Sequence, residues 1–111
     1  MTKIIYNKLV RDNIPEIIRA DHKTCSTFIL DEQAFILKLK EKLMEESCEV
    51  KEADNKKDII GELADVLEIV ESIEKVYQIN HEEVVLKKQT KKNKNGGFDR
   101  KLLLEYVEDS K

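Results

Sequence analysis

Two apolar helical repeats joined by a short polar turn constrain the fold of this chain more than any other feature. Spacings of three and four residues place side chains on one face of a helix. The first repeat comprises Ile36, Leu39, Leu43, Val50 and Ala53, and the second comprises Ile59, Leu63, Val66, Val70, Ile73 and Tyr77. Only the polar segment DNKKD, residues 54–58, separates the two repeats. The pattern therefore predicts two antiparallel helices, at 32–53 and 59–77, that pack along these apolar faces.

The flanking sequence predicts two further helices and two extended segments. Asp12 is expected to cap a short helix that has Pro15 in its first turn, and Asn80 is expected to cap a longer helix. The longer helix carries acidic residues at its start and lysines at its end, and it stops before the paired glycines of NKNGGFD. The β-branched and aromatic residues at 25–30 favour an extended link or a brief strand. Residues 101–107 fit either a last helical turn or a strand paired with 25–30.

Length and composition favour a single small domain. A chain of 111 residues is typical of one domain, 1–111, but it can bury only a small core. We therefore expect an all-α helical bundle, built on the central antiparallel helix hairpin and completed by self-association as a dimer or tetramer. The net charge of -3 does not favour a nucleic-acid polymer as a partner. No apolar run fits a membrane span or a signal peptide, so we expect no membrane association and a cytoplasmic location.

Four carboxylates lie beside the two predicted apolar faces. Glu46 fills the gap in the first repeat, and Glu49 follows it three positions later. Glu62 and Asp65 repeat this spacing in the second helix. Side chains three positions apart on a helix are neighbours, so the two pairs are expected to face each other across the hairpin. Carboxylates gathered in a partly apolar place repel one another and lose hydration.

A divalent cation would remove both penalties. Ligand sets made only of oxygen select a hard ion such as Mg²⁺ or Mn²⁺, whose shell is completed by water and substrate phosphates. The pattern thus predicts a metal site for a phosphorylated ligand. The alternative is a solvated helix face on which the acids pair with nearby lysines such as Lys42 and Lys51. The place of Glu46 in the apolar face, and the doubling of the motif, favour the metal site.

The acidic segments EESCE and ELAD, separated by twelve residues, resemble the E-x-x-E…E-x-x-D signature of the MazG-like all-α nucleotide pyrophosphohydrolases. Other segments resemble a small subgroup of this family, in the same order along the chain. YNKLVRDNIPEII resembles its KLVRDKIPE opening, KLMEESCEV and ELADVLEIV its central helices, and KKNKNGGFDRKLLL its C-terminal lysine-glycine-glycine-phenylalanine segment. Two positions depart from that pattern. Asn13 stands where the opening often has lysine, and Asn95 stands where an arginine commonly precedes the glycines.

The resemblance implies Mg²⁺-dependent hydrolysis of an NTP- or dNTP-type nucleotide to the monophosphate and pyrophosphate. Carried over by position, the acids expected to bind Mg²⁺, or Mn²⁺ in its place, are Glu46, Glu49, Glu62 and Asp65. Glu45 and Glu46 would be the catalytic pair, with Glu45 orienting or deprotonating the attacking water. A nucleotide substrate and a second copy of the chain are the expected partners.

Basic residues at both ends of the chain fit a supporting role at the substrate phosphates. Lys8 and Arg11 lie three positions apart in NKLVRD, and Arg11 has the geometry for a bidentate contact. Lys91 and Lys94 precede the paired glycines; if the arginine replaced by Asn95 touches phosphate, Lys94 or its neighbour Lys92 has to serve instead. The alternatives are a surface ion pair for the first two residues and a solvated helix end for the lysines.

Two other functions remain compatible with these residues. One is phosphoribosyl-ATP pyrophosphohydrolase, an enzyme of the same family with a different nucleotide substrate. The other is a catalytically silent helical module that binds a nucleotide or a protein partner. Turnover of a nucleotide panel separates the first from a general pyrophosphohydrolase, and absence of any turnover identifies the second.

Overall fold

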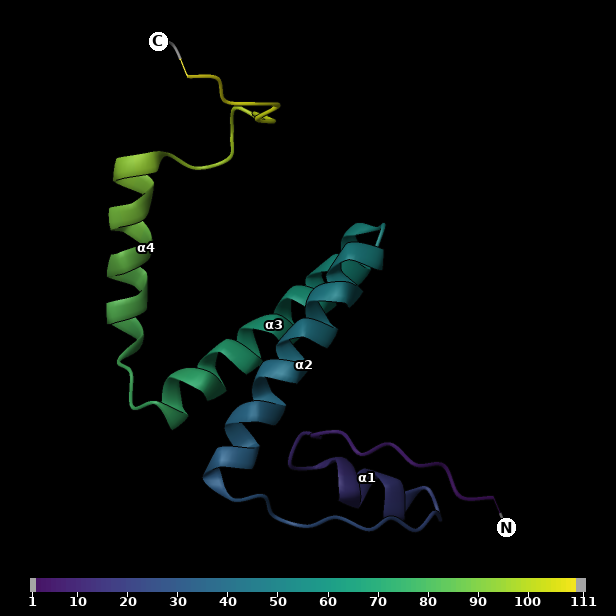
Figure 1. The fold of residues 1–111 in the computed structure, drawn as a ribbon. Coiled ribbons are helices and arrows are strands. Elements are labelled where there is room, and N and C mark those ends of the chain that lie inside the picture. The colour runs from purple at the N-terminus through teal and green to yellow at the C-terminus, as the bar shows by residue number, and fades with distance from the viewer. Residues whose placement is uncertain (1, 110–111) are drawn as a thin grey trace. The chain divides into compact units, whose positions relative to one another are not determined.

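The structure is a computed structural model that describes residues 2–109. Its helices are α1 (Ile14–Ala20), α2 (Glu32–Glu52), α3 (Lys56–Val76) and α4 (His81–Asn95). No strand occurs among residues 2–109, so the predicted all-α fold is confirmed (Figure 1). Within the same residues, no helix combines the length and the apolar character needed to cross a membrane. The chain divides into two compact units, the first ending at Ile79 and the second beginning at Asn80. The assignment of 1–111 as one domain stays a prediction.

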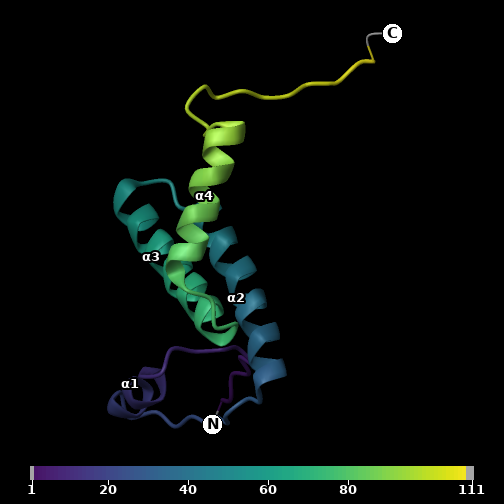
Figure 2. The ribbon, with the colours of Figure 1, turned by 90° about the vertical axis from the view of Figure 1, so that its left-hand side faces the viewer.

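In the first unit, α2 and α3 form the predicted helix hairpin and lie side by side (Figures 1 and 2). The Asp31 carboxylate caps α2 by accepting a hydrogen bond from the backbone N–H of Ala34 at 2.9 Å. The Asn55 side chain caps α3 by accepting one from the backbone N–H of Asp58 at 2.9 Å. These caps satisfy N–H groups that have no partner inside the helix. Because Asn55 is a strong N-cap, α3 starts at Lys56, ahead of the predicted boundary at Ile59.

The hairpin buries little apolar surface. Leu39 and Ile69 are the buried apolar side chains of the described residues, at 3% and 7% exposure. Most of the predicted apolar face is half-buried, but Leu63 and Tyr77 remain 47% exposed. Ile69 lies outside the predicted repeat and directly precedes Val70 in it. The face of α3 that packs on α2 is therefore centred slightly to one side of the predicted one.

Several local expectations are wrong. The N-cap of α1 is Asn13 rather than Asp12, because Pro15 takes one of the first two helical positions and so fixes where the helix begins. Pro15 does lie in the first turn, as predicted. Residues 25–30 form a link, one of the two predicted alternatives, and no strand, whereas 101–107 form neither a helical turn nor a strand. A strand needs a partner for its backbone hydrogen bonds, and no strand is available within residues 2–109.

The second unit contains α4, which starts where the sequence predicts. The Asn80 side chain accepts from the backbone N–H of Glu82, and the Asn80 backbone N–H donates to the Glu83 carboxylate, each at 3.0 Å. This reciprocal capping box fixes the first turn. The helix ends at Asn95, and its C-cap residue Gly96 has a φ of 84°, in the left-handed region that favours glycine. No side chain of α4 is buried.

Candidate metal centre

The four acidic residues singled out in the sequence converge between α2 and α3. Glu46 and Glu49 come from α2, and Glu62 and Asp65 come from α3. One carboxylate oxygen from each of the four lies within 4.8 Å of all the others. The three-residue spacing puts each pair on one helix face, and the packing of α2 against α3 brings the two pairs together. We refer to these four residues as the acidic cluster.

Two oxygens of the acidic cluster are buried without a hydrogen-bond donor. Glu46 keeps only 7% of its surface exposed, although it is ionisable. Within the described part of the chain, its Oε2 atom has no hydrogen-bond partner, and neither does Oε2 of Glu62. A buried carboxylate oxygen that loses water without gaining a donor costs free energy. A bound cation would supply the compensation that these two atoms lack.

The carboxylates of the cluster also shift each other's protonation. A hydrogen bond with Glu49, followed by burial and the nearby negative charges, raises the pKa of Glu62 to about 6. Burial, followed by the hydrogen bond and charge of Glu49, raises the pKa of Glu46. Both shifts show that negative charge is disfavoured at this place unless a cation balances it.

Internal cations balance only part of the charge of the cluster. Arg11 contacts Asp65, with Nη2 2.7 Å from Oδ1, and Lys42 Nζ lies 3.7 Å from Glu46 Oε1. Among residues 2–109, no cationic side chain forms an ion pair with Glu49 or Glu62. Arg11 and Lys42 are also shared with Glu68 and Glu45, so at least two negative charges of the four acids stay unbalanced when all are ionised.

The dimensions of the acidic cluster fit a hard divalent cation. Oxygens bind Mg²⁺ at about 2.0–2.1 Å and Ca²⁺ at about 2.3–2.6 Å, so opposite ligands are roughly 4.2 Å and 5 Å apart. The observed limit of 4.8 Å lies between these values, and closing to Mg²⁺ requires about 0.6 Å of adjustment at most. A donor set made only of carboxylate oxygens disfavours soft metals. The residues present therefore suit a hard divalent cation, and the choice of Mg²⁺ or Mn²⁺ stays a prediction.

A cleft of about 410 Å³ opens at the cluster. Its lining consists of Glu49, Glu52, Ala53, Asp58 and Glu62. Two of these carboxylates belong to the acidic cluster, so water or a ligand in the cleft has direct access to it. With four carboxylates around it, the cleft repels an anion unless a cation is bound first.

Glu45, the second predicted catalytic residue, lies beside the acidic cluster but outside its group of four converging oxygens. Lys8 donates a hydrogen bond from Nζ to Oε1 of Glu45 at 3.1 Å, and Lys42 Nζ lies 3.7 Å from the same oxygen. The hydrogen bond from Lys8 is the main reason that the pKa of Glu45 is lowered. Glu45 is therefore an ionised, anchored carboxylate at neutral pH.

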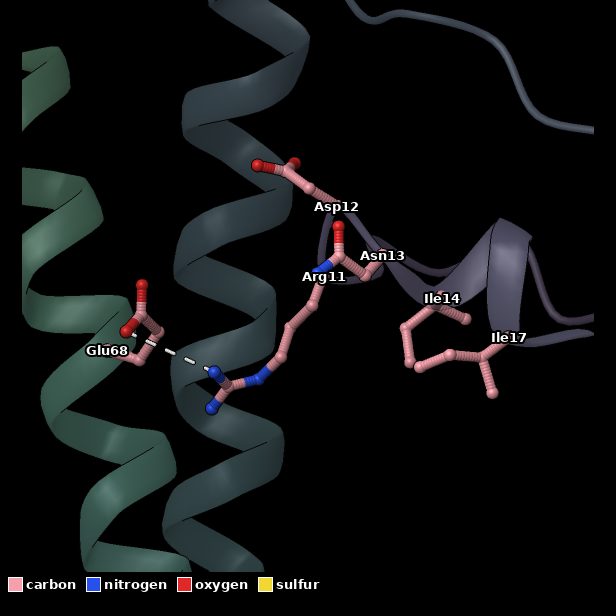
Figure 3. Close-up of a pocket in the computed structure, with 6 residues that line it drawn as sticks. All are labelled: Arg11, Asp12, Asn13, Ile14, Ile17 and Glu68. Carbon is pink, nitrogen blue, oxygen red and sulfur yellow. Dashed lines mark ion pairs between the residues drawn. The ribbon is translucent and has the colours of Figure 1, made fainter.

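Arg11 lies between the acidic cluster and a second cleft. Besides its contact with Asp65, its Nη1 atom is 4.0 Å from Oε1 of Glu68, one turn further along α3. The cleft, of about 450 Å³, is lined by Arg11, Asp12, Asn13, Ile14, Ile17 and Glu68 (Figure 3). Both basic residues predicted near the amino terminus thus lie against acids of the hairpin. These contacts are the ion pairs of the alternative interpretation, and the phosphate-binding role stays a prediction.

The remaining predicted phosphate ligands, Lys91 and Lys94, are exposed residues in the last part of α4, in the second unit. Their role also stays a prediction.

Lys42 is a cation of the site that received no role in the predicted metal centre. Lys42 pairs with both Glu45 and Glu46, and its spacing of four residues from Glu46 on one helix was the signal for that contact.

Comparisons of this chain with protein-family models, with curated proteins and with solved structures found no match. The case for a function therefore rests on the geometry of the site and on the motifs of the sequence.

Proposed function

We propose that this chain is a Mg²⁺-dependent nucleotide pyrophosphohydrolase of the MazG-like all-α class. It cleaves an NTP- or dNTP-type nucleotide to the monophosphate and pyrophosphate, and we assign the reaction to the cytoplasm. The observation that carries the proposal is the convergence of Glu46, Glu49, Glu62 and Asp65, with two buried oxygens that have no donor. The ordered resemblance of the surrounding segments supplies the identity of the reaction.

The four residues of the acidic cluster hold the metal ion in this proposal. Bound there, Mg²⁺ neutralises charge on the phosphates and lowers the pKa of a coordinated water. The four carboxylates would place the ion, and through it they would determine where the substrate phosphates bind. The buried position of Glu46 excludes water from one side of the cluster and strengthens its attraction for a cation.

Glu45 orients the attacking water rather than deprotonating it. The hydrogen bond from Lys8 holds its carboxylate in place at the edge of the cluster. The same contact lowers the pKa of Glu45, and a carboxylate with a lowered pKa is a weaker base. Its ionised form still accepts a hydrogen bond from water. Lys8 and Arg11 lie close enough to the acids to meet phosphate oxygens once the substrate is bound.

The test is release of pyrophosphate from a panel of NTPs, dNTPs and phosphoribosyl-ATP in the presence of Mg²⁺. We expect turnover by the wild type, and a loss of about 100-fold or more in Glu46→Gln and Glu62→Gln, because each removes one charged ligand. Glu41→Gln on α2 and Glu71→Gln on α3 are matched controls, since both residues are exposed and lie outside the acidic cluster.

Stability measurements separate loss of the metal site from loss of the fold. Mg²⁺ at 100 times its dissociation constant stabilises a folded protein by about 2.7 kcal/mol, which raises the melting temperature. We expect this rise in the wild type and the controls but not in the two cluster variants. Metal-dependent turnover that survives both cluster substitutions would remove the site assignment. A rise in melting temperature without turnover on any nucleotide would favour the silent binding module.

We also infer that the hairpin works as a self-associated dimer or tetramer. Ile60, Leu63 and Leu67 lie at spacings of three and four on α3 and are 59%, 47% and 61% exposed. Their stripe is continuous with the half-buried face that packs on α2, so the apolar surface of α3 is wider than α2 covers. A second copy of the hairpin presents a surface of the same kind, which supports a bundle of at least four helices.

A further inference from the structure

A close ion pair joins the amino-terminal segment to the acidic cluster. Arg11, just ahead of α1, reaches to α3 and donates from Nη2 to Oδ1 of Asp65 at 2.7 Å. The two residues are 54 positions apart in the chain. Within residues 2–109, this is the one hydrogen bond that the Asp65 carboxylate accepts from a side chain. Figure 3 shows the Arg11 side chain extending away from α1 and toward Glu68, which lies one turn beyond Asp65.

We propose that Arg11 is a positioning residue for the metal centre: it holds the Asp65 carboxylate by one oxygen so that the other is directed at the cation. The inference rests on the metal site of the proposed function, but it does not depend on turnover. It assigns Arg11 a role before any phosphate arrives, distinct from a contact with substrate.

The need for such a residue follows from the electrostatics of the cluster. Asp65 keeps 41% of its side chain exposed, and three other carboxylates lie close to it. Repulsion from those carboxylates favours a rotamer in which Asp65 points into water. A charge-assisted hydrogen bond from a guanidinium opposes that movement. Metal-binding carboxylates are commonly oriented by such an outer hydrogen bond, and loss of the bond typically costs 10–100-fold in metal affinity.

Charge balance supports the retention of Arg11 when the ion is bound. Arg11 at Asp65 and Lys42 at Glu46 together neutralise two of the four carboxylates. A divalent cation would offset the two charges that remain on the four acids, while Arg11 and Lys42 are also shared with Glu68 and Glu45. Displacement of Arg11 would leave one more negative charge uncompensated beside the ion. The structure therefore favours a cation bound with Arg11 still on Asp65 over a cation that replaces it.

The direction in which metal affinity changes when Arg11 is replaced distinguishes a positioning role from simple charge repulsion. Coulomb repulsion alone predicts that removing the positive charge of Arg11 strengthens the binding of a cation. Positioning predicts the opposite. We expect Arg11→Gln to weaken the binding of Mn²⁺ and of Mg²⁺, measured by calorimetry on the full chain without nucleotide, by about 10–100-fold. Arg11→Lys keeps a donor and a charge, and is expected to recover part of the loss.

Two further variants complete the design. Arg19→Gln removes the same charge from the last turn of α1 and serves as the matched control, with unchanged metal affinity expected. Asp65→Asn weakens metal binding by itself, and Arg11→Gln added to it should cause little further loss, because Arg11 acts through Asp65. This non-additivity distinguishes positioning from a general effect on the fold, which would lower affinity in both backgrounds.

The results that overturn the inference differ from those that overturn the proposed function. Unchanged or tighter metal binding in Arg11→Gln refutes the positioning role, and leaves the metal centre and the hydrolase proposal standing. Metal binding that depends on Arg11 and Asp65, in a protein that hydrolyses no nucleotide, sustains the positioning role and refutes the hydrolase. A wild-type chain that binds neither Mn²⁺ nor Mg²⁺ refutes both.

Discussion

The acids of the cluster differ in how far their side chains are exposed to water. Glu46 is almost fully enclosed, whereas Glu49, three residues later on the same helix, is exposed. Hydration stabilises the charge of Glu49 directly, while Glu46 depends on its neighbours for compensation. Glu49 nevertheless contributes to the raised pKa values of both Glu46 and Glu62. One exposed carboxylate thus links the protonation of its two neighbours.

The raised pKa of Glu62 predicts an inverted dependence of stability on pH for the metal-free protein. The folded state holds the Glu62 proton with a pKa of about 6, above the ordinary value of 4.5. Between these values the folded chain binds more protons than the unfolded chain, so this group adds stability as the pH falls from 7 to 5. We expect Glu62→Gln to flatten that gain in denaturant-unfolding curves recorded in a chelating buffer.

Two comparisons isolate the contribution of Glu62. The lowered pKa of Glu45 acts below the ordinary value of 4.5, outside this window, and it cancels in the difference between wild type and variant. In the presence of Mg²⁺ the trend should reverse, because protons compete with the ion for the same oxygens. Equal pH profiles for wild type and Glu62→Gln, without metal, would contradict the electrostatic description of the cluster.

At the level of helices, capping residues determine where α2, α3 and α4 begin, and packing between helices determines which face of a helix is buried. Asp31, Asn55 and Asn80 each end a non-helical segment and accept a hydrogen bond from the first turn of the next helix. These caps are each worth about 1 kcal/mol and are visible in the sequence. The sequence does not show which face of α3 packs on α2. The burial of Ile69 depends on how the side chains of α2 fill the space opposite.

Gly61 offers a test of α3 that is independent of the cluster chemistry. It lies inside the helix with an ordinary backbone conformation, and a Cβ atom added there would meet nothing within 4 Å. Alanine loses less conformational freedom on folding than glycine does, so Gly61→Ala should raise the free energy of unfolding by about 0.5–1 kcal/mol. Denaturant unfolding of the full chain measures the change. A destabilised variant would mean that the space above Gly61 is filled in the assembled protein, most simply by a second copy.

At the scale of the whole molecule, most large apolar side chains of the described residues are exposed or only half-buried. Only Leu39 and Ile69 are buried apolar residues within the described part of the chain. In the second unit, considered by itself, several large apolar side chains are also exposed: Leu102, Leu103, Leu104, Tyr106 and Val107. Contiguous exposed apolar residues are rare on soluble monomers and usually mark an interface. The self-association that we propose would bury part of this surface and so add to the stability of a small chain.

Substitution on the exposed stripe of α3 tests the predicted association. Leu67→Glu places a charge on the surface that a second hairpin would cover, so the assembly should dissociate and its melting temperature should fall. Sedimentation equilibrium at several protein concentrations measures the mass directly. Gln33→Glu, an exposed residue of the first turn of α2, introduces the same charge and is expected to leave the mass unchanged. A wild type that sediments as a 13.0 kDa monomer at all concentrations would contradict the prediction.

The sequence predicted the helix hairpin and the convergence of the acids, because both depend on periodicity. A spacing of three residues fixes Glu46 beside Glu49 and Glu62 beside Asp65 on any helix. The irregular course of residues 101–107 escaped prediction, and the alternatives at 25–30 stayed open, since apolar and β-branched residues resemble a strand whether or not a partner strand exists. The N-cap of α1 also escaped prediction: it is Asn13, whose side chain makes no capping hydrogen bond, and the position of Pro15 sets the boundary.

By itself, the sequence determined which segments are helical and which acids share a helix face, because these properties are local to a few residues. Only the tertiary structure decided that Arg11 reaches Asp65, that Lys8 anchors Glu45, and that one Glu46 oxygen is buried without a donor. Those contacts join residues tens of positions apart, or depend on side chains packed around a buried atom. No local pattern encodes the direction in which an irregular segment returns to a hairpin, so the chain has to fold before Lys8 and Arg11 meet their acids.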